Sequence, residues 1–190
     1  RLQRAKSKLP SYYAVRAILP PRAYEQSSSE LCAAENSLAG DSVLDLTCGL
    51  GVDTLALSRK FNRVVSCERD EVLAAITRYN LSLLGVYNVT IENCSAEEYL
   101  AKTTDHFDWI FVDPDRRGEN GEKLVLLEEC SPNVVELFPK LAINETLGKY
   151  VDVGGIIFQI VGICKTDQMS SDNTLYAPFS TLRTIYNKGN

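Results

Sequence analysis

A glycine-containing turn after an apolar run is the part of the sequence best suited to hold a small ligand. In the segment VLDLTCGLGVDT, Asp45 stands near the end of the run Val43–Leu46, and Gly49 and Gly51 follow in the turn that leads to a predicted helix. Glycine has no Cβ, so the backbone of such a turn can approach a ligand closely. The pattern predicts a binding turn between a strand and a helix.

A second acidic residue follows at the distance that a ribose-binding site requires. Glu68 lies nineteen positions after Gly49, at the end of the apolar run Val64–Cys67. An acid at this place can accept hydrogen bonds from both hydroxyls of a ribose. Because ligands bind beyond the carboxyl ends of parallel strands, Asp45, Gly49 and Glu68 are expected to converge on one crevice. We therefore expect a nucleoside in this crevice.

Two residues argue against a dinucleotide in the crevice. The third glycine of the dinucleotide fingerprint would stand at position 54, where the sequence has Thr54. Asp53 stands at the start of the predicted helix, where its charge would repel a pyrophosphate. The turn therefore favours a cationic nucleoside cofactor without phosphates over NAD. A doubly wound fold that uses glycine only to turn the chain is the alternative that needs no ligand.

Two later strand ends add candidate residues to the same crevice. In NCSAEEYL, the Asn93–Glu97 loop can flank an adenine and present Ser95 or a backbone amide to its edge. The next apolar run ends in DWIFVDPDRRG and delivers Asp113 and Pro114 to the place where a substrate would meet the cofactor. Asp113 can orient or deprotonate the attacking group. An ordinary turn at a strand end is the simpler alternative.

Apolar runs alternate with segments of helical periodicity along the central part of the chain. The strands are expected at Val43–Leu46, Val64–Cys67, Val89–Glu92 and Trp109–Val112. The helices are expected at Leu55–Lys60, at Ala96–Lys102, and at Val72–Leu84 with a buried face of Ala75, Ile76, Tyr79 and Leu83. This alternation predicts an α/β fold with a Rossmann-like, doubly wound parallel sheet.

The ends of the chain follow a different pattern. Ser27 and Glu30 have the spacing of a capping box, which predicts a helix to about Leu38, and Ser131–Pro132 predicts the start of a helix to about Leu141. Two apolar runs around Gly154–Gly155 predict an antiparallel hairpin, and LYAPF and STLRTIYNKG predict a strand and a closing helix. We therefore expect an N-terminal extension at 1–41, a ligand-binding domain at 42–143 and a small β-rich segment at 144–190.

The composition excludes several classes of protein. The chain has 190 residues, of which 45% are hydrophobic and 24% charged, and it contains no apolar run long enough to span a membrane. Six cysteines stand singly with one histidine, which argues against a metal site and for reduced thiols in the cytoplasm. The net charge is −5, yet every charged residue in Arg1–Tyr24 is basic, so this segment can meet phosphates or serve as a solvated arm.

The motifs together resemble a known family. Residues 42–141 look like a class I methyltransferase that uses S-adenosylmethionine, and KLP, PP, EQSSSE, LDLTCGLGVDT, CERD and DPDRR resemble the bacterial THUMP-like-domain methyltransferases typical of Bacteroidetes. The resemblance implies an RNA substrate, ribose binding by Glu68, and Asp113 facing the substrate. The full set of expected cofactor-binding residues is Asp45, Thr47, Cys48, Gly49, Gly51, Glu68, Arg69, Ser95, Ala96 and Asp113.

The residues after the fourth strand bear on the substrate. Enzymes that methylate exocyclic base amines show DPPY where this sequence reads DPDRR, so an amino-group target is in doubt. DPDR is also similar to the DPPR of 5-methyluridine methyltransferases, which need a later cysteine nucleophile that this chain does not display. Asp113 and Pro114 are the expected catalytic residues, and Asp115, Arg116 and Arg117 the expected substrate contacts. Arg116 and Arg117 can hold a phosphate or pair with nearby acids.

The C-terminal segment resembles another family. NETLGKYVDVGGIIFQIVGICKTDQMSSDNTLYAPFSTLRTIYNKG is similar to the periplasmic core domain of MacB-like transporter permeases. The resemblance implies an incomplete methyltransferase sheet with an exposed edge, unless the hairpin replaces the missing strands. The alternative function is therefore a non-catalytic transporter fragment fused to a truncated methyltransferase, in which the C-terminal piece packs as an independent β unit.

Overall fold

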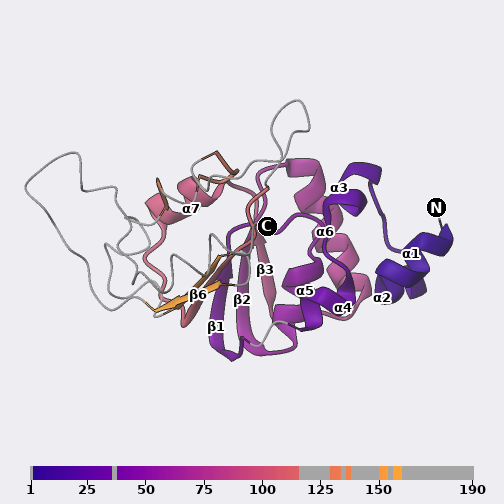
Figure 1. Cartoon of the computed structure of the whole chain (residues 1–190), viewed down its shortest axis with the longest axis horizontal. Coiled ribbons are helices and arrows are strands. Elements are labelled where there is room, and N and C mark those ends of the chain that lie inside the picture. The colour runs from indigo at the N-terminus through magenta and orange to yellow at the C-terminus, as the bar shows by residue number, and fades with distance from the viewer. Residues whose placement is uncertain are drawn as a thin grey trace, which may run out of the picture.

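The computed structural model describes residues 2–35, 38–115, 129–133, 136–137, 150–153 and 156–159. Figure 1 shows a central sheet with helices on both of its faces. Helices α4, α5 and α6 lie on one side, and α7 lies on the other. This layered arrangement is the α/β fold that the alternation of strands and helices predicts.

The sheet has the order β3-β2-β1-β4-β5-β6. Four parallel strands form its main part: β1 (Gly40–Asp45), β2 (Phe61–Cys67), β3 (Val89–Glu92) and β4 (Trp109–Val112). Strand β5 (Tyr150–Val153) continues the sheet parallel to β4, and β6 (Ile156–Gln159) closes it antiparallel to β5. The chain therefore leaves β1 toward β2 on one side and reaches β4 on the other. Such a reversal of strand order creates a crevice at the carboxyl ends of the strands.

Seven helices are defined in the part of the chain that the structure describes. The first four precede the sheet: α1 (Leu2–Lys8), α2 (Pro10–Ala14), α3 (Pro21–Gln26) and α4 (Glu30–Ala34). The others connect parallel strands: α5 (Val52–Ser58), α6 (Glu71–Leu83) and α7 (Ala96–Lys102). None of the helices in the described ranges is long and apolar enough to cross a membrane.

The core explains why the strands are continuous apolar runs. Leu44 and Val65 pack with Leu100 of α7 on one face of the sheet, whereas Val43 and Val64 pack on the other, in a cluster that includes Leu57 of α5. Strands buried on both faces need apolar side chains at successive positions. The central strands β1, β2 and β4 follow this rule, whereas the edge strand β3 buries only Ile91. All four expected strands are confirmed, with β3 and β4 at the predicted bounds.

The predicted capping box before α4 is wrong. Helix α4 begins two residues later than Ser27 would place it, because Ser29 is the capping residue and its hydroxyl accepts from the Cys32 N–H. Glu30 instead accepts from the Ser11 N–H at 2.8 Å and the Ser11 hydroxyl at 2.6 Å. The glutamate therefore ties α4 to α2 and does not cap its own helix.

The predicted buried face of α6 is also wrong. Tyr79 is 50% exposed and Leu83 39% exposed, whereas Thr77 and Asn80 are fully buried. The Thr77 hydroxyl donates to the Gly49 carbonyl at 2.9 Å, and Asn80 bonds to the backbone of the N-terminal extension. Polar groups that find partners can be buried, so the apolar stripe does not mark the inner face here.

The C-terminal predictions have mixed outcomes. The hairpin around Gly154–Gly155 is confirmed, because β5 and β6 pair antiparallel. The independent β unit is not what the structure has, because β5 pairs with β4 in the main sheet. Ser131 does not cap a helix: it pairs with Asp115 in an antiparallel bridge, and Asn133 accepts from the Glu136 N–H instead. The strand LYAPF, the closing helix and the end of the predicted helix at Leu141 lie outside the described residues.

Candidate functional site

A cavity of about 1020 Å³ opens at the carboxyl ends of the four main parallel strands. The residues that follow these strands line it: Thr47 after β1, Glu68 after β2, Cys94 after β3 and Asp113 after β4. The cavity lies where β1 separates β2 from β4, which is the expected ligand crevice of a doubly wound sheet. Its size is that of a site for a whole nucleoside or cofactor.

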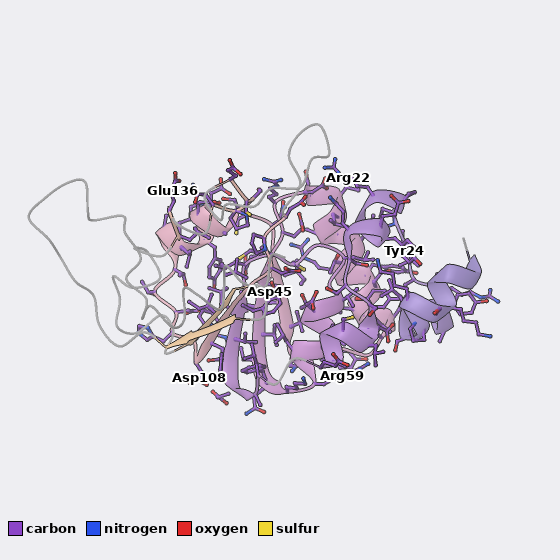
Figure 2. The ribbon with its side chains drawn as sticks, in the orientation of Figure 1. Arg22, Tyr24, Asp45, Arg59, Asp108 and Glu136 are labelled. Carbon is purple, nitrogen blue, oxygen red and sulfur yellow. The ribbon has the colours of Figure 1, made fainter. Side chains whose placement is uncertain are left out.

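Asp45 organises the turn from behind the cavity. Its side chain is fully buried, and it lies near the centre of the molecule (Figure 2). One carboxylate oxygen accepts from the Thr47 N–H at 2.9 Å, and the other accepts from the Thr54 and Ser66 hydroxyls, each at 2.7 Å. Burial raises the pKa of Asp45, although these hydrogen bonds oppose the rise. Asp45 therefore holds β1, α5 and β2 together at the start of the turn.

The two glycines of the turn have different surroundings. Gly51 has φ +79°, and a Cβ placed there would lie 2.6 Å from the Thr77 Cγ2 atom. Gly49 has φ +54°, and a Cβ placed there would meet no atom within 4 Å. Only glycine adopts these conformations without strain. Gly51 is therefore required for packing against α6, whereas Gly49 leaves space on the cavity side.

Glu68 connects the turn to the second strand end. Its carboxylate accepts from the Gly49 N–H and from the Asp70 N–H, both at 2.9 Å. Burial raises the pKa of Glu68, and these two hydrogen bonds oppose the rise. Each carboxylate oxygen has a second lone pair that can accept a hydroxyl. The side chain lines the cavity, so it is placed to bind a ribose.

Asp53 adds a second carboxylate to the cavity wall beside the turn. Burial raises its pKa from 3.8 to about 6, a hydrogen bond from the Ser28 side chain opposes the rise, and the carboxylates of Asp45 and Asp113 add to it. A cation in the cavity would favour the charged form of Asp53.

The loop after β3 is held by its own capping box. The Ser95 hydroxyl accepts from the Glu98 N–H, and the Glu98 carboxylate accepts from the Ser95 N–H. The capping box therefore engages both the hydroxyl and the N–H of Ser95, and a contact of Ser95 or a loop amide with a ligand stays a prediction. Ala96 and Glu97 follow in the first turn of α7, where amides have no partner within the helix, and both residues line the cavity.

The residues after β4 are held from both sides. The Asp113 N–H donates to the Thr47 hydroxyl at 2.8 Å, which joins the ends of β4 and β1. Asp115 and Ser131 exchange two backbone hydrogen bonds of 2.9 and 3.1 Å. Asp113, Pro114 and Asp115 all line the cavity, as do Ser131 and Pro132. The predicted substrate residues Arg116 and Arg117 lie outside the described residues.

The N-terminal extension forms a wall of the cavity that the sequence did not assign to the site. Its contribution comes from α3 and the residues beside it: Pro20, Arg22, Ala23, Gln26, Ser27 and Ser28. The signal available in the sequence was the motif EQSSSE, which supported the resemblance without suggesting a ligand contact. The extension at 1–41 therefore belongs to the site, although the domain boundaries themselves stay predictions.

Most of the predicted site residues come together around this cavity. Those that line it are Thr47, Cys48, Gly49, Glu68, Arg69, Ser95, Ala96, Asp113, Pro114 and Asp115. Asp45 and Gly51 do not line it, because Asp45 is enclosed by its hydroxyl partners and Gly51 faces α6. Their direct contact with the ligand stays a prediction, and the geometry shows that both residues support the turn.

The cavity wall is predominantly acidic. Six of its described residues carry a carboxylate and two carry a guanidinium: Asp53, Glu68, Asp70, Glu97, Asp113 and Asp115, against Arg22 and Arg69. Such a wall favours a cationic ligand and opposes a polyphosphate. The described residues contain no group of acids, histidines and cysteines that could hold a metal ion.

The strand order, the glycine turn and the acidic crevice define a class I methyltransferase fold. The family described as conserved hypothetical protein 95 matches residues 28–131, more than half of the chain, and the chain belongs to this family.

Solved structures of similar fold agree with this class. A candidate methyltransferase from Porphyromonas gingivalis W83 is 29% identical, with a TM-score of 0.68 over 80% of this chain and 38% of its own. A precorrin 8W decarboxylase from Methanobacterium thermoautotrophicum is 25% identical, with a TM-score of 0.51 over 72% of this chain and 68% of its own.

A curated relative is similar over a shorter region. The tRNA/tmRNA (uracil-C(5))-methyltransferase of Neisseria meningitidis serogroup A is 35% identical over 115 residues, which are 52% of this chain and 32% of the relative. The chain thus spans about a third of the length of this relative.

Proposed function

We propose that the chain binds S-adenosylmethionine and, as part of a methyltransferase, transfers its methyl group to RNA. The observation that carries this proposal is the acidic cavity at the carboxyl ends of β1 to β4, with the glycine turn and Glu68 hydrogen-bonded to each other in its wall. The alternative of a transporter fragment is not supported, because β5 continues the methyltransferase sheet.

The residues of the cavity fit the chemical groups of this cofactor. Glu68 has lone pairs for the ribose hydroxyls, and Gly49 lets the backbone approach the ligand. The amides of Ala96 and Glu97 in the first turn of α7 are suited to the adenine edge. Asp53 and Asp113 stabilise positive charge inside the cavity. The excess of carboxylates disfavours NAD, whose pyrophosphate would be repelled.

The cofactor supplies a methyl group on sulfonium, which is already activated for transfer. The chain therefore contributes mainly position, because an aligned approach of the acceptor removes much of the barrier. Asp113 and Pro114 form the wall that an acceptor would meet. The Asp113 N–H donates to the Thr47 hydroxyl at 2.8 Å, which fixes the backbone of this wall. Asp113 orients the acceptor or receives its proton.

An RNA acceptor is supported by the Neisseria relative, which is named a tRNA/tmRNA (uracil-C(5))-methyltransferase. Asp115, Arg116 and Arg117 are its proposed contacts. The placement within the THUMP-like-domain methyltransferases rests on the sequence motifs, and the RNA substrate supports a cytoplasmic location.

Calorimetric titration with S-adenosylmethionine, and separately with NAD, tests the cofactor. We expect saturable binding of S-adenosylmethionine alone, weakened at least about 10-fold by Glu68→Gln, which removes the charge but keeps the size of the side chain. Glu92→Gln is the matched control, because Glu92 is exposed and outside the cavity wall. Circular dichroism checks that each variant is folded. Equal weakening by both variants, or no binding by the folded wild type, would refute the proposal.

Transfer of the tritium-labelled methyl group of S-adenosylmethionine to total bacterial RNA tests the acceptor. We expect labelled methyl groups in the RNA when this chain replaces the matching region of a full-length relative. Asp113→Ala should lower this labelling at least about 100-fold. Labelled protein or small molecules without labelled RNA would move the proposal to another acceptor.

A further inference from the structure

The N-terminal wall of the cavity has one firmly anchored end. The Ile18 N–H donates to the Asn80 side-chain oxygen, and the Asn80 amide donates to the Ile18 carbonyl, both at 2.8 Å. Asn80 is fully buried in α6. Pro20 and Pro21 follow at once and start α3. Because two bonds to a buried amide fix Ile18, we take residues 18–28 as a unit and name it the strap.

The back of the strap is held by the first helix. The Lys8 ammonium donates to the Tyr24 carbonyl at 2.6 Å and lies 4.9 Å from the centre of the Tyr24 ring. Figure 2 shows Tyr24 on the side of the strap that faces the N-terminal helices. At the far end, the Ser28 side chain bonds to Asp53 of α5. Both ends and the back of the strap are therefore attached to the body of the protein.

Across the cavity mouth the strap is held differently. The Gln26 amide donates to the Asp115 carboxylate at 3.1 Å, and this bond is exposed to solvent. Asp115 is paired through its backbone to Ser131, and the Ser131 hydroxyl accepts from Arg69 at 3.1 Å. These four residues all line the cavity.

These bonds connect the strap to the opposite rim of the mouth. They run from Gln26 to Asp115, across the backbone bridge to Ser131, and through Arg69 to the end of β2. Gln26 and Asp115 lie at the surface, whereas the ends of the strap are held by the buried Asn80 and the partly buried Asp53. An exposed hydrogen bond exchanges readily with water, so the link between Gln26 and Asp115 opens first.

We propose that the strap is a gate of the cavity and that the Gln26–Asp115 hydrogen bond controls how fast the cofactor enters and leaves. The proposal rests on the proposed function, because it takes the sulfonium nucleoside as the ligand that passes. Gln26 acts as a positioning residue, since it holds the strap to Asp115 beside the Asp113–Pro114 wall. Opening of this bond widens the mouth without removing a group that binds the nucleoside.

Surface plasmon resonance with S-adenosylmethionine as the probe tests the gate. Gln26→Glu sets two carboxylates against each other and is expected to raise both the association and the dissociation rate about 5-fold or more. The added charge alone would attract the cation and slow its dissociation, so faster dissociation reports the opened strap. The double variant Gln26→Glu with Asp115→Asn reverses donor and acceptor, keeps the charge of the cavity wall, and is expected to restore both rates. Asp115→Asn alone measures the effect of removing one charge from the wall.

Hydrogen exchange of the unliganded protein tests the strap without any ligand. The amides of Tyr24 and Ser27 bond to Pro20 and Ala23 within the strap. Gln26 is the last residue of α3, so we expect this helix to fray when the bond to Asp115 is lost. These amides should then exchange faster in Gln26→Glu and at the wild-type rate in the double variant. Unchanged exchange would show that the bond does not control the mobility of the strap and would overturn the gate.

The outcomes separate the two proposals. Absence of S-adenosylmethionine binding to the wild type would refute the proposed function, while the exchange measurement still decides whether the strap moves. Binding with unchanged rates in Gln26→Glu would refute the gate alone. An increase of the dissociation rate only, with weaker binding, would make Gln26 a direct ligand contact and would also refute the gate.

Discussion

The glycine turn and the strap both line the same cavity but are stabilised in different ways. The turn, residues 45–54, is fixed by the buried Asp45 network and by Thr77 against its backbone. The strap is fixed at its ends and meets the opposite rim through the exposed Gln26–Asp115 bond. Buried bonds define one geometry, whereas exposed bonds permit opening. The site therefore combines a rigid wall for recognition with a wall that can move.

The largest effect is expected for a substitution in the rigid wall. Gly51→Ala forces a positive φ on alanine and sets its Cβ against Thr77, which should cost about 2–5 kcal/mol of the free energy of unfolding. Gly49→Ala, the matched control, meets open space and should cost only about 1–2 kcal/mol. Urea unfolding measures both variants. Equal costs would show that the turn does not pack rigidly against α6.

A smaller effect is expected where the two walls meet, at Asp53. Burial raises its pKa from 3.8 to about 6, so its protonated form is favoured in the folded state. The corresponding stability is present below pH 3.8 and is lost as the pH rises through about 6. Asp53→Asn should therefore match the wild type in acid and exceed its unfolding free energy by up to about 3 kcal/mol at neutral pH.

Urea unfolding of both proteins at about pH 3.5 and about pH 7.5 checks this prediction. A difference between the two proteins that does not change with pH would contradict it. The Ser28 contact would then be the main effect of Asp53, and the junction of strap and turn would carry no charge dependence.

The smallest effects distinguish the two faces of α6. Thr77→Val removes the hydroxyl that holds the Gly49 carbonyl and should cost about 1 kcal/mol in thermal or urea unfolding. Tyr79→Ser changes the exposed face and should cost less than about 0.5 kcal/mol. If Tyr79→Ser cost more than Thr77→Val, the inner face of α6 would be the one that the apolar spacing predicts. Thr77 would then not be a main contact of the rigid wall.

Much of the fold could be predicted from sequence because β1, β2 and β4 are buried at successive positions. Their apolar runs, with the shorter run of β3, located the sheet, and the glycine turn and Glu68 indicated which edge of it carries the site. The face of α6 could not be predicted in this way. The burial of Thr77 and Asn80 depends on partners at Gly49 and Ile18 that are remote in the sequence.

The same limit applies to the site. Asp45 was identified from the sequence as part of the turn, but its enclosure by Thr54 and Ser66 depends on how three elements pack, so the sequence could not show it. The strap has no apolar period or acidic pair that would indicate a ligand. Gln26 reaches the cavity only because Asn80 and Asp53 fix the segment around it.

The pairing of Gln26 with Asp115 has a consequence for synthesis of the protein. The two residues are separated by 89 positions, so the ribosome adds Asp115 roughly 5–18 s after Gln26 at ordinary bacterial speeds. Asn80, which binds Ile18, is likewise added 62 positions after it. The strap is thus made well before the residues that hold it in place, and a nascent polypeptide cannot close around a small molecule until translation has passed β4.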